Sequence, residues 1–268
     1  MYSLPSYKFK FSKVQCNTWA HPITSGFKNI DYFLSSELME KKNSQTDYSE
    51  KLINLPGIGI NYEKSKIKIE QNNTINTSKK IIFFNLQSLY KLLPQDDHIY
   101  LEIIEKEPNS FFWFIKADVE SVTLQFKERL NRIFLTKNLF YEDYIFFNER
   151  CSLSKFLYLI NKSDIILDSF NWSGCNTSLD AISLNKPIVT YPSNFMRGRH
   201  TYSFLKKLDI LDTIASSKTD YVNIAVKLAR DLNFRKSIIK RIDKNKSILF
   251  NDDQPIKFLE KFLISMSK

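Results

Sequence analysis

The sequence predicts an α/β protein with a doubly wound parallel sheet over most of its length. From about residue 81, short runs rich in β-branched and aromatic residues alternate with longer stretches whose apolar residues recur at helical spacing. This alternation is typical of βαβ units, which build a parallel sheet covered by helices. No repeat with a period of about 20 to 50 residues occurs, which excludes a repeat array.

The β-rich runs are predicted to be strands at 81–86, 111–117, 144–148, 164–170, 187–191 and, more weakly, 210–215. The amphipathic stretches are predicted to be helices at 97–107, 119–131, 153–162, 177–185, 200–208, 219–231 and 234–248. The segment Asp252-Asp253-Gln254-Pro255 is predicted to open a final helix.

The first part of the chain has a different pattern. Residues 14–22 and 30–36 read as strands, and the Asn-, Thr- and Lys-rich segment at about 68–80 is the best linker candidate. We therefore expect three regions: 1–75 as the end or remnant of a first lobe, 81–250 as a complete α/β lobe, and 251–268 as a C-terminal helix.

Composition narrows the class of protein. The 268 residues are 43% hydrophobic and 25% charged, as in ordinary globular proteins, and the formal net charge is +10. Because the lysines are scattered, with no run of basic residues, nucleic acid is an unfavoured partner and a phosphate-bearing small ligand fits better. Three cysteines without C-x-x-C pairing, no signal peptide and no apolar run long enough for a bilayer predict a cytoplasmic protein that does not enter a membrane.

The loop after the fourth predicted strand combines features of an anion site. It carries Gly174, one of five glycines, followed by Asn176, Thr177 and Ser178. Glycine allows close backbone approach, and the polar residues are able to cap the next helix, whose free N–H groups attract anions. Asp180 is expected in the first helical turn. The alternative is an ordinary helix N-cap with a first-turn acid.

Two other strands are followed by cations. Gln87, Ser88 and Lys91 come after the first strand of the sheet, and Arg197 and Arg199 bracket a glycine after the fifth. Lysine and arginine bind phosphate oxygens, arginine in a bidentate manner. The alternative interpretation is that these cations are ordinary surface charges. Because ligands of parallel α/β sheets sit outside the carboxyl ends of the strands, all three loops together predict a phosphate ligand.

Several common sites are absent from the sequence. There is no G-x-G-x-x-G fingerprint, no P-loop and no G-x-S-x-G elbow. The three histidines lack metal-ligand spacing, and no D-x-D triplet flanked by strands is present to hold a metal-bound nucleotide sugar. The sequence therefore predicts no metal site.

Ordered motifs from about Val14 to Phe262 resemble the catalytic region of the O-linked N-acetylglucosamine transferase family, including its SPINDLY-type and bacterial relatives. The strongest is DIILDSFNWSGCNTSLDAISLNKPIVTYPSNFMRGRHTYSFLKKLDI, at 164–210. The others are HPITSGFKNIDYF (21–33), YSEKLINLPG (48–57), QSLYKLLP (87–94), EIIEKEPNSFFWFIK (102–116) and DYVNIAVKLARDL (220–232).

The resemblance implies a two-lobed, metal-independent glycosyltransferase whose second, Rossmann-like lobe, 81–250, binds a UDP-sugar, here UDP-N-acetylglucosamine. The region 1–75 then belongs to the acceptor-side lobe. The reaction implied is direct transfer, with inversion, to a hydroxyl of an acceptor protein or glycan, with no cofactor.

The resemblance also implies roles for individual residues. Lys91 neutralises the diphosphate, and His21 is counted with it as catalytic. Asn176 and Thr177 contact the diphosphate, Asp180 holds the ribose hydroxyls, and Ser88 falls at a polar contact. His21, Pro22 and Thr24 are expected at the cleft between lobes.

This chain departs from the family pattern in places. Cys175 replaces a histidine of the animal enzymes, Asn176 replaces the first threonine of a pair, and Ala20 replaces a glycine before His-Pro in bacterial relatives. About eighty residues precede the second lobe, fewer than a first lobe needs. The alternatives to an active transferase are an inactive nucleotide-sugar-binding module, a fragment completed by a second chain, and a sugar-nucleotide epimerase.

Overall fold

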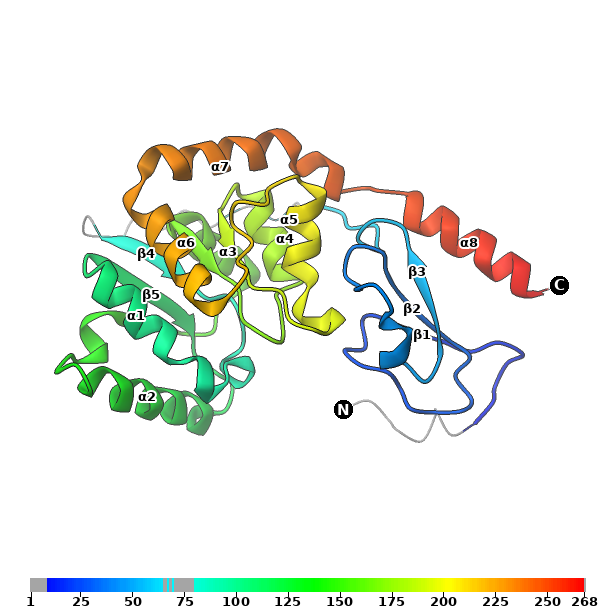
Figure 1. Ribbon diagram of the computed structural model, residues 1–268, viewed down its shortest axis with the longest axis horizontal. Coiled ribbons are helices and arrows are strands. Elements are labelled where there is room, and N and C mark those ends of the chain that lie inside the picture. The colour runs from blue at the N-terminus through cyan, green and yellow to red at the C-terminus, as the bar shows by residue number, and fades with distance from the viewer. Residues whose placement is uncertain (1–8, 65–66, 68, 70–79, 268) are drawn as a thin grey trace.

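The computed structural model describes residues 9–64, 67, 69 and 80–267. It contains two parallel sheets, a larger one surrounded by helices and a smaller one formed by the N-terminal part of the chain (Figure 1). The predicted linker at 68–80 lies almost entirely outside the described residues.

The larger sheet has five parallel strands in the order β6-β5-β4-β7-β8. Their bounds are β4 Ile81–Phe84, β5 Ser110–Ile115, β6 Ile145–Asn148, β7 Ile165–Leu167 and β8 Ile188–Val189. The chain begins in the middle, moves to one edge, crosses back and fills the other edge. The strand order therefore reverses between β4 and β7, and this confirms the predicted doubly wound sheet. A crevice is expected where the loops after these two strands separate.

Helices connect successive strands and cover both faces of this sheet. They are α1 His98–Lys106, α2 Glu120–Leu135, α3 Leu153–Lys162, α4 Asn176–Ser183, α5 His200–Lys207, α6 Lys218–Arg230 and α7 Leu232–Asn245. Because βαβ crossovers are right-handed, α1 and α2 lie on one face and α3 and α4 on the other. Helix α6 packs against α1, and α3 packs against α4.

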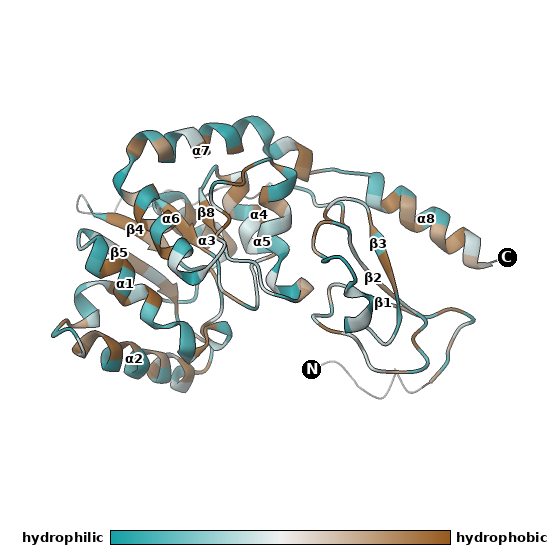
Figure 2. Cartoon of the chain, viewed as in Figure 1, coloured by the Kyte–Doolittle hydropathy of each residue, from teal (hydrophilic) through white to brown (hydrophobic). Residues whose placement is uncertain are grey.

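Aromatic side chains fill the centre of the larger sheet. Phe83 stacks on Phe112 with ring centroids 5.3 Å apart, and Phe114 stacks on Phe147 at 5.6 Å. Strands buried on both faces read as nearly continuous apolar runs, which is why this sheet was predictable from sequence. Figure 2 shows the same arrangement, with hydrophobic strands inside and hydrophilic residues along the outer surface of α7.

The smaller sheet consists of β1 Cys16–Thr18, β2 Tyr32–Ser36 and β3 Lys51–Leu55, all parallel, in that order. The first two fall within predicted strands. Strand β3 was not predicted, because its exposed Lys51 and its largely uncovered side chains give no clear alternation.

The smaller sheet is joined to the larger lobe by a shared core and by polar contacts. Phe33, Met39 and Ile58 are fully buried in the same cluster as the central strands. The indole of Trp19 lies 5.5 Å from the imidazole of His200 on α5. Helix α8, Gln254–Ser267, returns to this sheet, where the ring of Phe262 meets that of Tyr32 edge-on at 5.1 Å.

Two expectations about strands need correction. The strands predicted at 164–170 and 187–191 are shorter, and the weak strand at 210–215 is reduced to one isolated bridge between Thr190 and Ile214. The reason is a turn, in which Asp209 adopts a φ of 56° and the N–H of Ile214 donates to the carbonyl of Leu211. A chain turned in this way cannot extend along β8.

Candidate functional site

The loops after β4 and β7 meet at the point where the strand order reverses. The side-chain amide of Gln87, two residues beyond Asn85, donates to the hydroxyl of Thr177 at 2.9 Å. Gln87 is itself fixed by its backbone N–H, which donates to the side chain of Asn85 at 3.0 Å. Two of the three predicted phosphate loops are therefore brought together by direct contact.

Lys91 ends a short 3-10 turn, Leu89–Lys91, in the first of these loops. Its ammonium donates to Oε1 of Gln87 at 3.2 Å and lies 4.9 Å from the ring centroid of Trp172. Burial lowers the pKa of Lys91, and the negative charge of Asp168 opposes this shift. Within the part of the chain that the structure describes, no carboxylate forms an ion pair with it. A half-buried ammonium that no carboxylate of the described residues contacts in an ion pair is suited to an anionic ligand.

The N-terminus of α4 supplies the second cationic element. The helix begins at Asn176, and the N–H groups of Ser178 and Leu179 already donate to the carbonyl of Cys175. The N–H groups of Asn176 and Thr177 have no acceptor among the described residues. They point along the positive end of the helix dipole, where an anion is favoured.

The expected side-chain caps are not formed. The N-cap position is Cys175, whose side chain makes no capping hydrogen bond, and Asn176, Thr177 and Ser178 are the first three helical residues. The hydroxyl of Ser178 is buried against that of Thr201 at 2.8 Å. Ser178 is therefore a structural residue, and the side chains exposed to a ligand are those of Asn176 and Thr177.

Gly174 is required by close packing at the start of α4. A Cβ at this position would lie 2.4 Å from Oγ of Ser178, 2.8 Å from Nε2 of Gln87 and 2.9 Å from Oγ1 of Thr177. The glycine thus leaves room for the contact that joins the two loops. The expected close approach of a ligand to the backbone at Gly174 stays a prediction.

Asp180 lies in the second turn of α4, one turn later than expected, because the helix begins at Asn176. Burial raises the pKa of its carboxyl group to about 6. Among the described residues no hydrogen bond or ion pair holds this carboxylate, and the ring of Tyr62 is close enough to feel its charge. A buried acceptor without a donor fits a ligand hydroxyl.

The two predicted arginines have different surroundings. Arg199 donates from Nε to the carbonyl of Met39 at 2.7 Å and from its terminal nitrogen to that of Ser193 at 3.2 Å. It therefore holds the smaller sheet to the larger lobe, and its expected role at the phosphate is not supported. Arg197 lies over the ring of Phe195 and borders a cavity that also contains Lys91.

That cavity, of about 420 Å³, separates the two parts of the chain. Pro22 and Ile23 line it from the smaller sheet, and Lys91, Trp172 and Arg197 line it from the larger lobe. Pro22 is thus at the expected cleft. Beside it, Nδ1 of His21 lies 2.7 Å from the carbonyl oxygen of Ile23.

Thr24 does not face the cleft. Its hydroxyl donates to Oε2 of Glu50 at 2.6 Å and lies 2.9 Å from the hydroxyl of Ser49. Glu50 is 2% exposed and also accepts from the N–H of Ser25 at 2.7 Å. Thr24 therefore belongs to a polar network inside the N-terminal region, and the expected position in the cleft is wrong.

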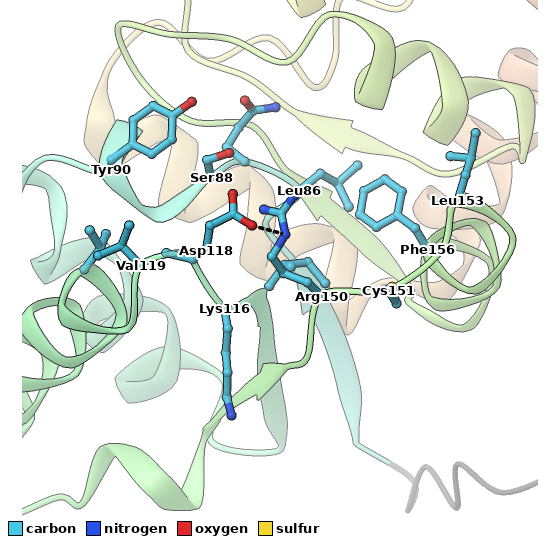
Figure 3. Close-up of a pocket in the computed structure, with 14 residues that line it drawn as sticks. Leu86, Ser88, Tyr90, Lys116, Asp118, Val119, Arg150, Cys151, Leu153 and Phe156 are labelled. Atoms are coloured by element: carbon cyan, nitrogen blue, oxygen red, sulfur yellow. Dashed lines mark ion pairs between the residues drawn. The ribbon is translucent and has the colours of Figure 1, made fainter.

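A second cavity, of about 430 Å³, was missed by reasoning from sequence. It opens beside Gln87 and Ser88 and continues along the ends of β5 and β6 (Figure 3). Phe156 and Leu153 form an apolar side, and Asp118 and Arg150 face each other across it with 2.6 Å between Oδ1 and Nε. One indication of this cavity was present in the sequence, which is the position of its residues along the chain. Asp118 and Arg150 follow β5 and β6, whose carboxyl ends lie at the same edge of the larger sheet as the loop that carries Lys91.

Over residues 9–64, 67, 69 and 80–267, no group of three His, Cys, Asp or Glu side chains could hold a metal ion. Within those ranges, no helix combines the length and apolar character needed to cross a bilayer.

The fold is that of the two-lobed glycosyltransferases. A mutant of the O-GlcNAc transferase of Thermobaculum terrenum superposes with a TM-score of 0.82 at 22% identity, over 94% of this chain and 48% of that one. WaaG, a glycosyltransferase of lipopolysaccharide biosynthesis, superposes with a TM-score of 0.55 at 13% identity, over 88% of this chain and 63% of that one. The chain belongs to glycosyl transferase family 41, whose model matches residues 57–257. The resemblance seen in the sequence is confirmed.

Curated relatives are similar over much of this chain. The probable UDP-N-acetylglucosamine–peptide N-acetylglucosaminyltransferase SEC of Arabidopsis thaliana is 24% identical, over 94% of this chain and 26% of its own length. The UDP-N-acetylglucosamine–peptide N-acetylglucosaminyltransferase of Caenorhabditis elegans is 25% identical, over 70% of this chain and 16% of its own. The chain spans about a quarter or less of these two relatives.

Proposed function

We propose that this chain binds a UDP-sugar and takes part in transfer of the sugar, N-acetylglucosamine, to a hydroxyl group of a protein Ser or Thr. The observation that carries the proposal is Lys91, a half-buried ammonium that forms no ion pair with a carboxylate of the described residues and that Gln87 holds beside the N-terminus of α4. The names of the relatives in Arabidopsis thaliana and Caenorhabditis elegans support the choice of sugar and acceptor.

In this proposal the diphosphate lies between Lys91 and the first N–H groups of α4. Gln87 holds both elements, because its amide contacts Lys91 and Thr177. The nucleoside occupies the cavity of about 430 Å³ that begins at Ser88, and the ring of Phe156 offers a stacking surface for the base. Asp180 accepts hydrogen bonds from the ribose hydroxyls. The sugar then faces the cavity between Lys91 and Pro22.

The chemistry is a direct displacement at the anomeric carbon. The acceptor oxygen forms a bond to this carbon while its bond to the diphosphate oxygen breaks, and the configuration inverts. Negative charge grows on the departing diphosphate, so the ammonium of Lys91 and the helix end stabilise the transition state more than the ground state. No cofactor or metal takes part in this scheme.

His21 is the proposed acceptor of the hydroxyl proton. It precedes Pro22, which lines the cavity on the side opposite Lys91. If Nδ1 donates to the carbonyl of Ile23, Nε2 is the basic nitrogen of the neutral ring. That tautomer is the one required of a general base.

The test separates binding from transfer. Calorimetry with UDP and with GDP measures whether the site recognises a uridine diphosphate. Incubation with labelled UDP-N-acetylglucosamine and Ser/Thr peptides then measures label transfer, free hydrolysed sugar and epimerised nucleotide sugar. Tight UDP binding with label on peptide supports the proposal, and an epimerised product supports the alternative isomerase. Absence of UDP binding would refute it.

A further inference from the structure

Asp168 is a buried carboxylate that the proposed reaction does not use directly. It follows the last residue of β7 and is 4% exposed. Its Oδ1 accepts from the N–H of Gly174 at 2.8 Å, and its Oδ2 accepts from the hydroxyls of Ser173 at 2.6 Å and Thr190 at 2.7 Å. All three partners donate, which is the arrangement that an ionised carboxylate requires.

These hydrogen bonds fix the loop that leads into α4. The chain leaves the sheet at Asp168, and the N–H of Gly174 returns to the Asp168 carboxylate, so one carboxylate closes the loop 168–174 on itself. Ser173 is also tied to α5, because its Oγ accepts from the N–H of Thr201 at 2.9 Å. Burial of such a group without its donors costs several kcal/mol, so the loop and the carboxylate depend on each other.

Asp168 also lies on the side of the loop that faces Lys91. The two residues border the same small internal cavity, of about 20 Å³. Two more carboxylates border it, but both are paired, Asp96 with Lys218 and Asp97 with Arg129. Asp168 is therefore the carboxylate of this cavity that has no cationic side chain bound to it.

The other titratable groups around Lys91 are neutral or directed elsewhere. Burial raises the pKa of the Cys175 thiol to about 12 and lowers the pKa of the His200 imidazole to about 4. The guanidinium of Arg197 lies over the ring of Phe195. Among the described residues that border this cavity, Asp168 is therefore the carboxylate beside Lys91 that no ion pair neutralises.

We infer that Asp168 is a positioning residue of the donor site, which holds the Gly174 loop against α4 and supplies negative charge beside Lys91. The inference rests on the proposed function for the identity of the ligand. The role in loop geometry depends on hydrogen bonds to Gly174 and Ser173, and the role in charge depends on the electrostatic effect of Asp168 on Lys91. Substitutions can therefore test the two roles separately.

The electrostatic part has a defined direction. Burial lowers the pKa of Lys91, and the charge of Asp168 raises it again. Burial also raises the pKa of Asp168, and its hydrogen bonds with Gly174, Ser173 and Thr190 act against that shift. Removal of the Asp168 charge should therefore lower the pKa of Lys91 and move the alkaline loss of diphosphate binding to lower pH.

The experiment uses three variants of the full chain and UDP as the probe. Asp168→Asn removes the charge and keeps the shape. Ser173→Ala keeps the charge and breaks the link to the loop. Thr190→Val also removes one donor to Oδ2, but from the residue after β8, away from the loop, and is the matched control. NMR of 13C-labelled lysine gives the pKa of Lys91 without ligand, and calorimetry from about pH 6 to 9 gives UDP affinity.

Asp168→Asn should lower the pKa of Lys91 and reduce UDP affinity, with the larger loss at the alkaline end of this pH range. Ser173→Ala should weaken UDP binding at every pH and leave the Lys91 titration in place, while Thr190→Val should change neither. An unchanged Lys91 titration in Asp168→Asn would overturn the charge role. Equal UDP affinities for Ser173→Ala and Thr190→Val would overturn the loop role, and this comparison remains decisive if Asp168→Asn does not fold.

Failure of the proposed function gives a different result. If the unaltered chain does not bind UDP, the donor assignment is wrong, and the Lys91 titration in the ligand-free variants still decides whether Asp168 sets its charge.

Discussion

The side-chain amide of Gln87 donates to the hydroxyl of Thr177 at 2.9 Å, across the point where the strand order of the larger sheet reverses. Its oxygen accepts from Lys91 at 3.2 Å. One amide therefore holds the ammonium and the helix N-terminus at a fixed separation. A diphosphate needs both cationic elements at once, so this contact should influence binding more than its own small energy suggests.

The coupling between these residues can be measured with a double-mutant cycle. Gln87→Leu and Thr177→Val should each weaken UDP binding by about three- to tenfold, as expected for the loss of one hydrogen bond. Because both remove the same contact, the double variant should bind only slightly worse than either single one. Calorimetry measures the affinities, and Gln125→Leu on the exposed side of α2 is the control. Strictly additive effects would show that the contact plays no part.

Gly174→Ala should damage binding through the same contact. The new methyl group would press on the side chains of Gln87, Thr177 and Ser178, all within 2.9 Å of its position. We expect a loss of about 1–3 kcal/mol in stability from overpacking and a loss of about tenfold or more in UDP affinity.

Gly26→Ala is the matched control for this substitution. Gly26 has a φ of 71° and nothing within 4 Å of its Cβ position. The strained backbone should cost about 1 kcal/mol, and UDP affinity should stay the same. Thermal unfolding and calorimetry on both variants separate the two effects. Equal UDP affinities for the two alanine variants would contradict the packing argument.

Asp180 should make UDP binding depend on pH near 6. Burial raises the pKa of its carboxyl group to about 6, and only the ionised form accepts two hydrogen bonds from a diol. Affinity should therefore rise as pH increases through about 6 and should lose this step in Asp180→Asn. Calorimetry at about pH 5 and 7 checks this. A step that persists in the variant would assign the titration to another group.

The raised pKa of Asp180 makes the stability of the ligand-free chain fall with rising pH, whereas UDP affinity should rise. The pKa of Asp180 is higher in the folded chain than in the unfolded chain, so folding binds the proton and its contribution to stability is lost as pH rises through about 6. Asp180→Asn should raise the free energy of unfolding at pH 7 relative to the original chain, as measured by urea titration in the absence of UDP. A neutral or destabilising result would contradict the buried, donor-free environment.

Binding of UDP should not require a divalent cation. Among the described residues no cluster of His, Cys, Asp or Glu is able to hold one, and the proposed site offers an ammonium and backbone N–H groups to the diphosphate. Calorimetry before and after addition of excess chelator should give the same affinity. A loss of about tenfold on chelation, restored by magnesium, would mean that the diphosphate charge is neutralised by an ion.

The sheet was predictable from sequence because its signal is local. Runs such as IIFF at β4 and the aromatic run at β5 are buried on both faces, so each strand is a continuous apolar segment. Strand β3 gave no such signal, since only Leu55 among its side chains is buried. The strand predicted at 210–215 was wrong because a turn at Asp209 overrides the β propensity of the residues that follow it.

The candidate site was predictable to the level of loops and not of side chains. Parallel topology brings the loops at Gln87 and Gly174 to one edge, and the structure shows them in contact. The sequence could not show that Arg199 bonds to Met39, or that Thr24 bonds to Glu50, because these partners lie far away in the chain. Asp168 was missed since an acid at a strand end reveals its donors only after folding.

The most direct test of the account is UDP binding by Lys91→Ala. Its ammonium is half-buried and has no carboxylate partner among the described residues, so removal should leave the melting temperature of the ligand-free chain nearly unchanged. A charge-assisted hydrogen bond to phosphate contributes about 1.5–3 kcal/mol, so UDP affinity measured by calorimetry should fall about ten- to a hundredfold. Lys236→Ala, which removes the same charge from the exposed side of α7, should bind as the original chain does. Equal weakening by the two substitutions would show that Lys91 is part of a diffuse positive surface and would contradict the donor site.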